Sequence, residues 1–185
     1  MTRNKRVFLD YASTTPLDRE VFKKVSKILR RNFHNASAFY KEGEISAKLL
    51  ESARTKVARL TSVKPDEVIF TGSGTESDNL AIIGLLKALK KNESGFFDYW
   101  KDKKPHIVTS NIEHPAILET CRALEKEGVA DVTYIPVLEN GRVDISQLKN
   151  FLRPETVLVT IIWANNEIGT IQSMRNISGE IKKYK

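Results

Sequence analysis

A glycine-containing turn near residue 72 has the residue types of an anion-binding site. The apolar run Val68–Phe70 predicts a short buried strand, and Gly72 and Gly74 follow it before an apolar, helical stretch. The unpaired N–H groups and positive dipole end of a helix N-terminus favour phosphate, and the hydroxyls of Thr75 and Ser77 add donors. The turn matches neither G-x-G-x-x-G nor the P-loop motif, so an ordinary capped turn is the competing interpretation.

Polar residues also follow two further predicted strands. His114 ends the turn after residues 106–110, and its imidazole could stack on a flat ligand or transfer protons near neutral pH. Asn165 and Asn166 follow residues 156–163 and offer amide donors and acceptors. Taken singly, a histidine is more often structural and asparagine pairs are common in turns. Because ligands of parallel sheets bind beyond the carboxyl ends of the strands, we expect the three exits to converge on one site.

Strands and helices alternate along the chain, which predicts an α/β fold with a mainly parallel sheet and flanking helices. The run 156–163 is the longest and most apolar predicted strand, so we expect it to be central. Residues 91–104 are polar and aromatic and predict a surface loop. The other predicted strands are 106–110 and 132–137, and the predicted helices are 16–31 with Thr15 as cap, 43–60, 75–90, 115–127, 144–148 and 174–184.

Composition excludes several classes of protein. The chain has 185 residues, which suits one domain, and its formal net charge of +7 is scattered rather than gathered into a basic patch. We therefore expect no nucleic-acid partner. No apolar run approaches the length of a membrane span or a signal peptide, so no membrane association is expected. One cysteine, Cys121, is consistent with a reducing cytoplasm, and no residues have metal-ligand spacing.

Four motifs occur in order along the chain: Leu9–Pro16, Phe70–Asn79, Glu113-His114 and Asn165–Gly169. Together they resemble the N-terminal half of cysteine desulfurases of the NifS and IscS type, which are pyridoxal 5'-phosphate (PLP) enzymes of the class V aminotransferase family. The resemblance implies a PLP-dependent transferase of fold type I. Residues 1–15 would lie on the small-domain side, and residues 16–185 would form an incomplete PLP-binding large domain. Such enzymes take sulfur from L-cysteine as a persulfide, leave alanine, and supply iron–sulfur cluster assembly or tRNA thiolation.

The same resemblance implies a role for individual residues. Gly74 and Thr75 would bind the PLP phosphate. His114 would stack over the pyridine ring and act catalytically in proton transfer. Asn166 would bind the PLP phenolic oxygen and the region of the substrate carboxylate. Asn35 would lie near the substrate, although the family often has Gly-Asn-Pro where this chain has asparagine between histidine and alanine.

Three family features have no counterpart in the sequence: the aspartate that pairs with the pyridine nitrogen, the Ser-x-His-Lys lysine that bonds PLP, and the nucleophilic cysteine, whose position Cys121 does not match. We therefore expect the N-terminal part of a cysteine desulfurase, inactive alone. Its expected partners are a sulfur-acceptor protein and either a second copy, as in a homodimer, or a complementary C-terminal half. The alternatives are a sister enzyme such as a selenocysteine lyase or an aminotransferase, a non-enzymatic partner-binding remnant, and a basic nucleic-acid binder.

Overall fold

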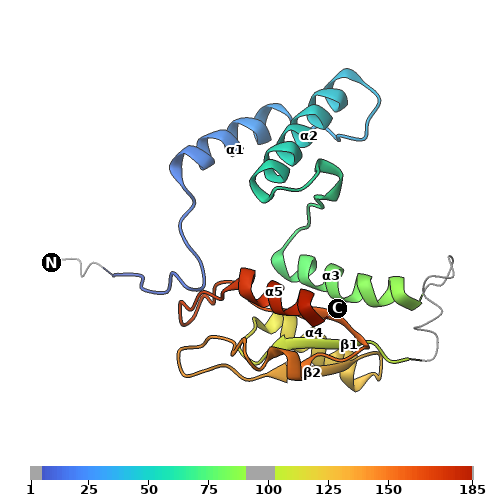
Figure 1. Cartoon of the computed structure of the whole chain (residues 1–185). Coiled ribbons are helices and arrows are strands. Elements are labelled where there is room, and N and C mark those ends of the chain that lie inside the picture. Colours follow the sequence, from blue (N-terminus) through green and yellow to red (C-terminus); the bar gives the residue numbers. More distant parts are fainter. Residues whose placement is uncertain (1–5, 91–102, 185) are drawn as a thin grey trace. The chain divides into compact units, whose positions relative to one another are not determined.

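The computed structural model describes residues 6–90 and 103–184. The chain divides into two compact units, Met1–Phe70 and Thr71–Lys185, and Figure 1 labels their helices and strands. Most of the loop predicted at 91–104 lies outside the described residues. The family-based boundary after residue 15 stays a prediction. Within the described residues, no helix is both long enough and apolar enough to cross a membrane.

The first helix of the first unit, α1, spans Arg19–Arg31. The predicted start, with Thr15 as cap, is wrong by one turn. Asp18 caps the helix instead, because its Oδ1 accepts the backbone N–H groups of Glu20 at 2.9 Å and Val21 at 3.0 Å. A carboxylate at this position also complements the positive end of the helix dipole.

The second helix, α2, spans Lys41–Thr61 and agrees with the predicted helix to within two residues. It ends at Ser62, whose left-handed φ of 58° stops the helix, and the short 3-10 turn η1, Pro65–Glu67, follows. The apolar faces predicted for both helices are present, but most of their side chains are exposed in this chain. The exposed large apolar residues include Val21, Phe22, Val25, Ile28, Leu29, Ile45, Leu49, Leu50, Val57 and Leu60.

The strand predicted at Val68–Phe70 does not form. The segment is extended but pairs with no described strand, and the Ile69 side chain is 69% exposed. Arg54 of α2 holds the segment by other means. Its guanidinium donates to the Val68 carbonyl and lies over the Phe70 ring, 5.0 Å from the centroid. A strand needs a neighbour to satisfy its backbone groups, so the apolar pattern alone was insufficient here.

The second unit is built on a parallel sheet of β1, His106–Ser110, β2, Asp131–Ile135, and β3, Thr156–Thr160. The order is β2-β1-β3, so the expectation that the 156–163 strand is central is wrong among the described strands. β1 is central, and all five of its residues are buried, whereas β3 is only partly buried along its length. The length and apolar composition of the segment indicated that it is buried, but they could not predict the order of the strands in the sheet.

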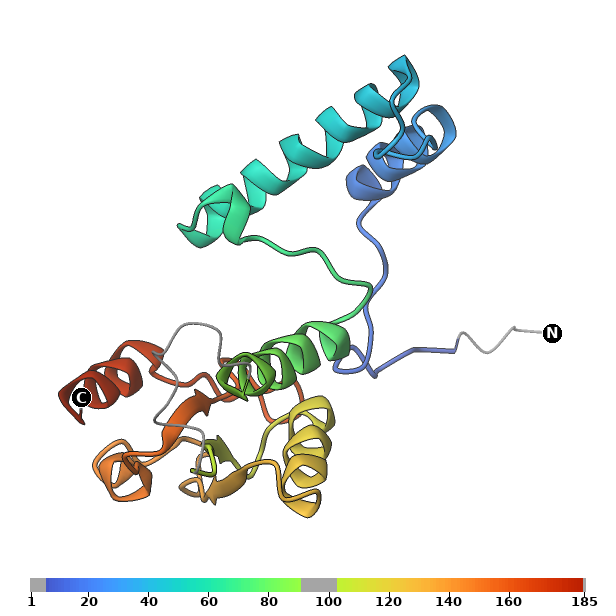
Figure 2. The same cartoon turned by 90° about the vertical axis from the view of Figure 1, so that its right-hand side faces the viewer.

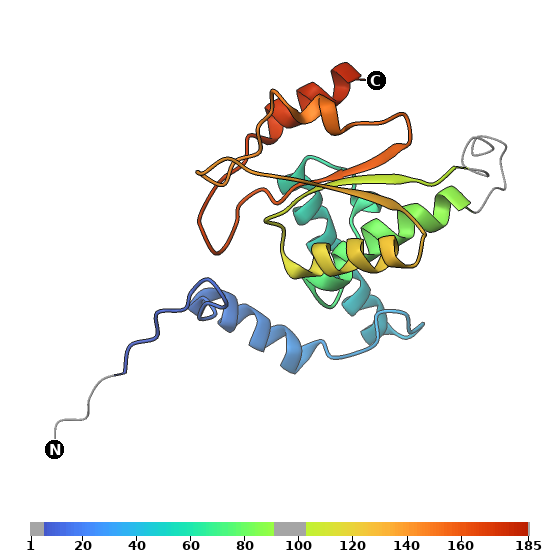
Figure 3. The same ribbon diagram turned by 90° about the horizontal axis from the view of Figure 1, so that it is seen from below.

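Helices cover both faces of this sheet. Figures 2 and 3 show α3, Gly74–Lys90, beside α4, Pro115–Lys126, on one face, and α5, Met174–Tyr184, on the other. The helix predicted at 144–148 is a turn instead, because Asp144 Oδ1 accepts the Ser146 backbone N–H at 3.0 Å and its hydroxyl at 2.6 Å. A 3-10 helix, η3, follows at Leu148–Phe151.

Two apolar clusters fill the spaces on the two faces of the sheet. The first joins α3, β1 and α4 and contains Ile82, Leu86, Leu89, Ile107, Ile117, Cys121, Leu124 and Ala130. The second joins β1, β2, η3 and α5 and contains Val108, Ile135, Val143, Leu148, Leu152 and Ile177. Adjacent residues of β1 enter opposite clusters, as the alternation of side chains along a strand requires. The helices α3, α4 and α5 are therefore held against one sheet.

His106, the first residue of β1, cross-links the three strands through its side chain. Its Nδ1 lies 2.8 Å from Thr156 Oγ1 on β3, and its Nε2 lies 2.8 Å from Thr133 Oγ1 on β2. The side chain is fully buried. Burial is the largest cause that lowers the pKa of His106, and nearby Arg153 lowers it further, against smaller opposing effects of Asp131 and Glu155. The buried ring is therefore held in its neutral form.

Candidate functional site

The turn before α3 is organised by its own side chains. Ser73 Oγ accepts the Glu76 backbone N–H at 3.1 Å, and Glu76 Oε2 accepts the Gly72 N–H at 2.7 Å. Ser77 Oγ lies 2.6 Å from Thr71 Oγ1 and 3.3 Å from the Ser73 carbonyl. Gly72 and Ser77, which the sequence offered as anion donors, are thus engaged within the turn.

Gly74 and Thr75 are the donors that this turn leaves exposed. Both lie in the first turn of α3, where backbone N–H groups lack helical acceptors. Among the described residues, the Thr75 hydroxyl has no hydrogen-bond partner, while the Thr75 carbonyl accepts Asn79 Nδ2 at 2.8 Å. An exposed hydroxyl beside a helix N-terminus is suited to a phosphate. Gly74 and Thr75, the positions that the family resemblance assigns to phosphate, are thus not engaged by the side chains of the turn, and their role stays a prediction.

His114 stands at the start of α4 as its N-cap. Its Nδ1 accepts the Ala116 backbone N–H at 3.1 Å, and Pro115 occupies the first helical position. Because Nδ1 is an acceptor in this contact, the neutral ring carries its proton on Nε2. The residue is exposed. The imidazole therefore has a fixed orientation and presents an Nε2–H group outward.

Asn165 shapes the loop after β3. Its Oδ1 accepts the backbone N–H groups of Glu167 at 2.9 Å and Ile168 at 3.1 Å, and its carbonyl accepts the Gly169 N–H at 2.9 Å. Gly169 has a φ of +70°, which few other residues adopt. The side chain of Asn165 is 9% exposed, whereas the following Asn166 is exposed. The loop thus holds the first asparagine inside and the second outside.

Glu113 occupies the corresponding position after β1. The residue is 6% exposed, and its Oε1 accepts the Ile162 backbone N–H at 2.8 Å and the Ser110 hydroxyl. Burial raises the pKa of Glu113 and Asp78 raises it further, while the bonds from Ser110 and Ile162 act in the opposite direction. No role of its own was predicted for Glu113 from the sequence. An acidic residue three positions after a buried strand was the signal that could have identified it.

Of the three exits predicted to converge on one site, those after β1 and β3 share one pocket, whereas the turn before α3 shares a separate groove with His114. A pocket of about 200 Å³ is lined by Ile112–Pro115 after β1 and by Asn165–Glu167 after β3. A second groove of about 560 Å³ runs between α3 and α4, with Thr75 and His114 among its lining residues. His114 borders both hollows, so it lies between the α3 N-terminus and the asparagine loop.

The comparison with protein families agrees with this arrangement. The family described as "Aminotransferase class-V" matches residues 7–185. The chain belongs to the class-V aminotransferase family. A cysteine desulfurase IscS of Dictyoglomus turgidum is 43% identical over 180 residues, which cover 97% of this chain and 43% of that protein. A cysteine desulfurase IscS of Methanosarcina thermophila is 42% identical over 182 residues, 98% of this chain and 42% of that protein.

Solved structures give the same fold. A NifS-like protein matches with a TM-score of 0.84 at 33% identity, over 97% of this chain and 46% of that one. A structure of SspA in complex with cysteine matches with a TM-score of 0.81 at 34% identity, over 95% of this chain and 47% of that one. The predicted α/β fold class and the resemblance to NifS and IscS proteins are confirmed. The chain spans less than half the length of the relatives it matches.

Two further residues, Asn35 and Cys121, are described by their local surroundings. Asn35 belongs to the first unit, where its Oδ1 accepts the Ser37 N–H at 2.9 Å, and its substrate role stays a prediction. Cys121 is buried in the α4 core, and burial raises the pKa of its thiol to about 11. Little of the thiol is therefore ionised at neutral pH, and Cys121 also does not match the position of the family's nucleophilic cysteine.

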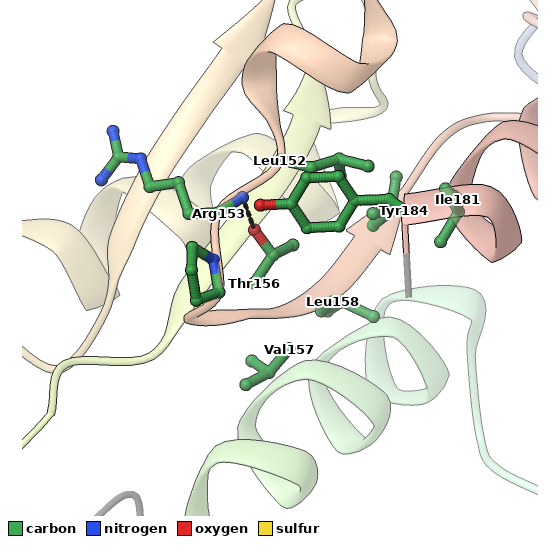
Figure 4. Close-up of a pocket in the computed structure, with 9 residues that line it drawn as sticks. Leu152, Arg153, Thr156, Val157, Leu158, Ile181 and Tyr184 are labelled. Carbon is green, nitrogen blue, oxygen red and sulfur yellow. Dashed lines mark hydrogen bonds between the residues drawn. The ribbon is translucent and has the colours of Figure 1, made fainter.

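A further groove of about 530 Å³ lies beside β3 and contains none of the predicted site residues. Figure 4 shows Val157 and Leu158 of β3 with Ile181 and Tyr184 of α5 around it. The Arg153 N–H donates to Thr156 Oγ1 at 2.8 Å at one end. Among the described strands β3 pairs only with β1, so this groove flanks an unpaired sheet edge.

Proposed function

We propose that this chain supplies the phosphate-binding, ring-facing and substrate-facing side chains of a PLP-dependent cysteine desulfurase. The observation that carries the proposal is the placement of His114 between the α3 N-terminus with Thr75 and the loop that presents Asn166. The identity to IscS proteins along nearly the whole chain supports the same reaction class.

The available donors fit the phosphate of PLP. Thr75 would donate its unpartnered hydroxyl, and the first-turn N–H groups at Gly74 and Thr75 would donate from the helix end. The dipole of α3 adds favourable charge at this point. Glu76 is the carboxylate next to Thr75 in the sequence. Its Oε2 accepts the Gly72 N–H at 2.7 Å and is thus engaged within the turn.

His114 and Asn166 would serve the ring and the substrate. PLP, when bound, withdraws electrons from the α-carbon of an attached amino acid. His114 holds its proton at Nε2 because Nδ1 accepts the Ala116 N–H, so Nε2 is the atom that can transfer a proton. Asn166 would offer its amide to the phenolic oxygen of PLP and to the substrate carboxylate.

The proposed substrate is L-cysteine, and a sulfur-acceptor protein is the proposed recipient for cluster assembly or tRNA thiolation. The 185-residue sequence contains no Ser-x-His-Lys segment, and Cys121 is buried and poorly ionised. The lysine that bonds PLP and the reactive cysteine would then come from sequence outside these 185 residues, in the same protein or in a partner. In the assembled protein two copies would associate, as the resemblance to the family implies.

Reconstitution tests this function. The chain is co-expressed with the remaining part of an IscS relative, including its Ser-x-His-Lys segment, and alanine and sulfide are measured with L-cysteine. We expect activity from the complex and none beyond a free-PLP control from this chain alone. His114→Ala should lower the rate by about 10²-fold or more, as loss of a proton-transfer group does. The surface variant Asn150→Ala, in η3, serves as control and should be unaffected.

Two results would contradict the proposal. One is an active complex in which His114→Ala and Asn166→Ala match the unaltered protein. The other is sulfide release by the chain alone at the rate of the complex. A complex that strongly prefers L-selenocysteine over L-cysteine would instead identify the sister activity.

A further inference from the structure

Two buried side chains link the exits of β1 and β3 in opposite directions. Glu113, after β1, accepts the Ile162 backbone N–H after β3 at 2.8 Å. Asn165, after β3, donates its Nδ2 to the Ile112 carbonyl after β1 at 2.9 Å. Each exit thus uses a side chain to bind the backbone of the other, and the two contacts close a reciprocal clamp.

The clamp residues directly precede the exposed residues of the proposed site. Glu113 is followed by His114, and Asn165 is followed by Asn166. In each pair the first residue is buried and the second is exposed. All four line the pocket of about 200 Å³ between the exits.

Both buried side chains have further bonds that restrict their movement. Glu113 Oε1 also accepts the Ser110 hydroxyl at the end of β1. Asn165 Oδ1 accepts two backbone N–H groups of its own loop, those of Glu167 and Ile168. Each of these side chains is bonded both to its own segment and to the segment after the other strand. A shift of one segment would therefore also shift the other. Such bonds are worth more in a buried setting, where water does not compete.

We propose that Glu113 and Asn165 are positioning residues that set the separation of His114 and Asn166 across this pocket. The proposal rests on the proposed function, because it concerns two residues assigned to cofactor and substrate. The physical reason is that groups that orient a bound ligand act only when they are correctly placed, and a misplacement of about 1 Å can cost about 10²-fold in rate. Neither clamp residue needs to touch the ligand to have this effect.

The sharpest variants each remove one of the two cross-exit bonds. Asn165→Asp keeps the Oδ1 acceptor for the loop but replaces the donor to the Ile112 carbonyl. Glu113→Ala removes the acceptor for the Ile162 N–H, whereas Glu113→Gln keeps an oxygen acceptor and should rescue it. Thr133→Val is the matched control, because it removes a cross-strand bond of His106 at the opposite end of the same sheet.

Two readouts are measured on the whole chain. The first is nitrogen NMR of the His114 imidazole and the Asn166 side-chain amide without ligand. The second is the affinity for pyridoxine 5'-phosphate, which has the ring and phosphate of PLP but no aldehyde to react with surface lysines. We expect Asn165→Asp and Glu113→Ala to shift or broaden both NMR signals and to weaken affinity about tenfold or more. Glu113→Gln and Thr133→Val should retain the unaltered signals and affinity.

The outcomes separate the two proposals. If the unaltered chain binds no pyridoxine 5'-phosphate, the proposed function is contradicted, while the ligand-free NMR signals still decide the clamp. If Glu113→Ala does not fold, the signals of Asn165→Asp alone test the clamp. The clamp is overturned if folded Asn165→Asp leaves the His114 and Asn166 signals unchanged, or if Thr133→Val shifts them equally.

Discussion

Replacement of the Thr75 hydroxyl should weaken phosphate binding without destabilising the fold. The hydroxyl has no partner among the described residues, and residue 75 is exposed, so Thr75→Val should change the free energy of unfolding by no more than about 0.5 kcal/mol. In a complex the hydroxyl would bond a charged oxygen, and such bonds contribute about 1.5–3 kcal/mol. Exposure favours the lower end, which corresponds to a roughly tenfold loss of affinity.

The assay titrates the chain with pyridoxine 5'-phosphate and with pyridoxine, which lacks the phosphate. Thr75→Val should weaken only the phosphorylated ligand, and Thr75→Ser, which keeps a hydroxyl, should restore most of the affinity. Binding is followed by calorimetry, and thermal unfolding of each variant confirms the fold. Equal affinities of the unaltered chain and Thr75→Val for the phosphorylated ligand would refute the assignment and leave the turn as an ordinary helix start.

Two further predictions concern the sheet that supports the site. Because the pKa of buried His106 is lowered from 6.5, the unfolded chain binds a proton before the folded chain does, so stability should fall as pH drops below about 6.5. His106→Gln should flatten this part of a plot of melting temperature against pH, and an unchanged slope would contradict the argument. Leu148 is fully buried in the second apolar cluster, which packs against α5. Leu148→Ala should lower the free energy of unfolding, measured with urea, by about 2–5 kcal/mol. A decrease below about 1 kcal/mol would contradict the packing described.

The fold was predictable where a local pattern and its tertiary setting agree. The strand at His106–Ser110, the helix after it and the positive-φ Gly128 that ends it were all evident from the sequence. The local sequence pattern was insufficient where the structure of a segment depends on which other strands pair with it. Val68–Phe70 has the composition of a buried strand but no described strand pairs with it, and the rank of Thr156–Thr160 in the sheet depends on its neighbours.

The exposed residues of the candidate site could be predicted from the sequence, but the buried side chains that hold them in place could not. Residue type and position after a strand made His114, Asn165 and Asn166 candidates, and the family resemblance selected Asn166 from the pair. The exits after β1 and β3 share one pocket, while the roles of these residues stay predictions. The cross-exit bonds of Glu113 and Asn165 join residues about fifty positions apart, a separation that no local pattern encodes. The sequence also could not show that Glu76 occupies the Gly72 N–H and so removes it from the anion site.

The last prediction concerns the surfaces that this chain leaves uncovered. Phe22 and Leu29 on the apolar face of α1 are 59% and 66% exposed, and β3 has no second partner among the described strands. Large apolar faces and free strand edges promote association. We therefore expect the isolated chain to form oligomers whose mass, measured by chromatography with light scattering, rises with concentration.

The variant Phe22→Lys with Leu29→Lys tests the contribution of the helix face to this association. Burial of each such side chain contributes about 1.5–3 kcal/mol, so two charged replacements should shift association to concentrations at least about a hundredfold higher. Because both residues are exposed, the secondary structure of the isolated chain should survive. The same variant should bind a complementary desulfurase half more weakly if that half covers α1. A monodisperse monomer that melts cooperatively at high concentration would show that the chain closes its own core and needs no partner.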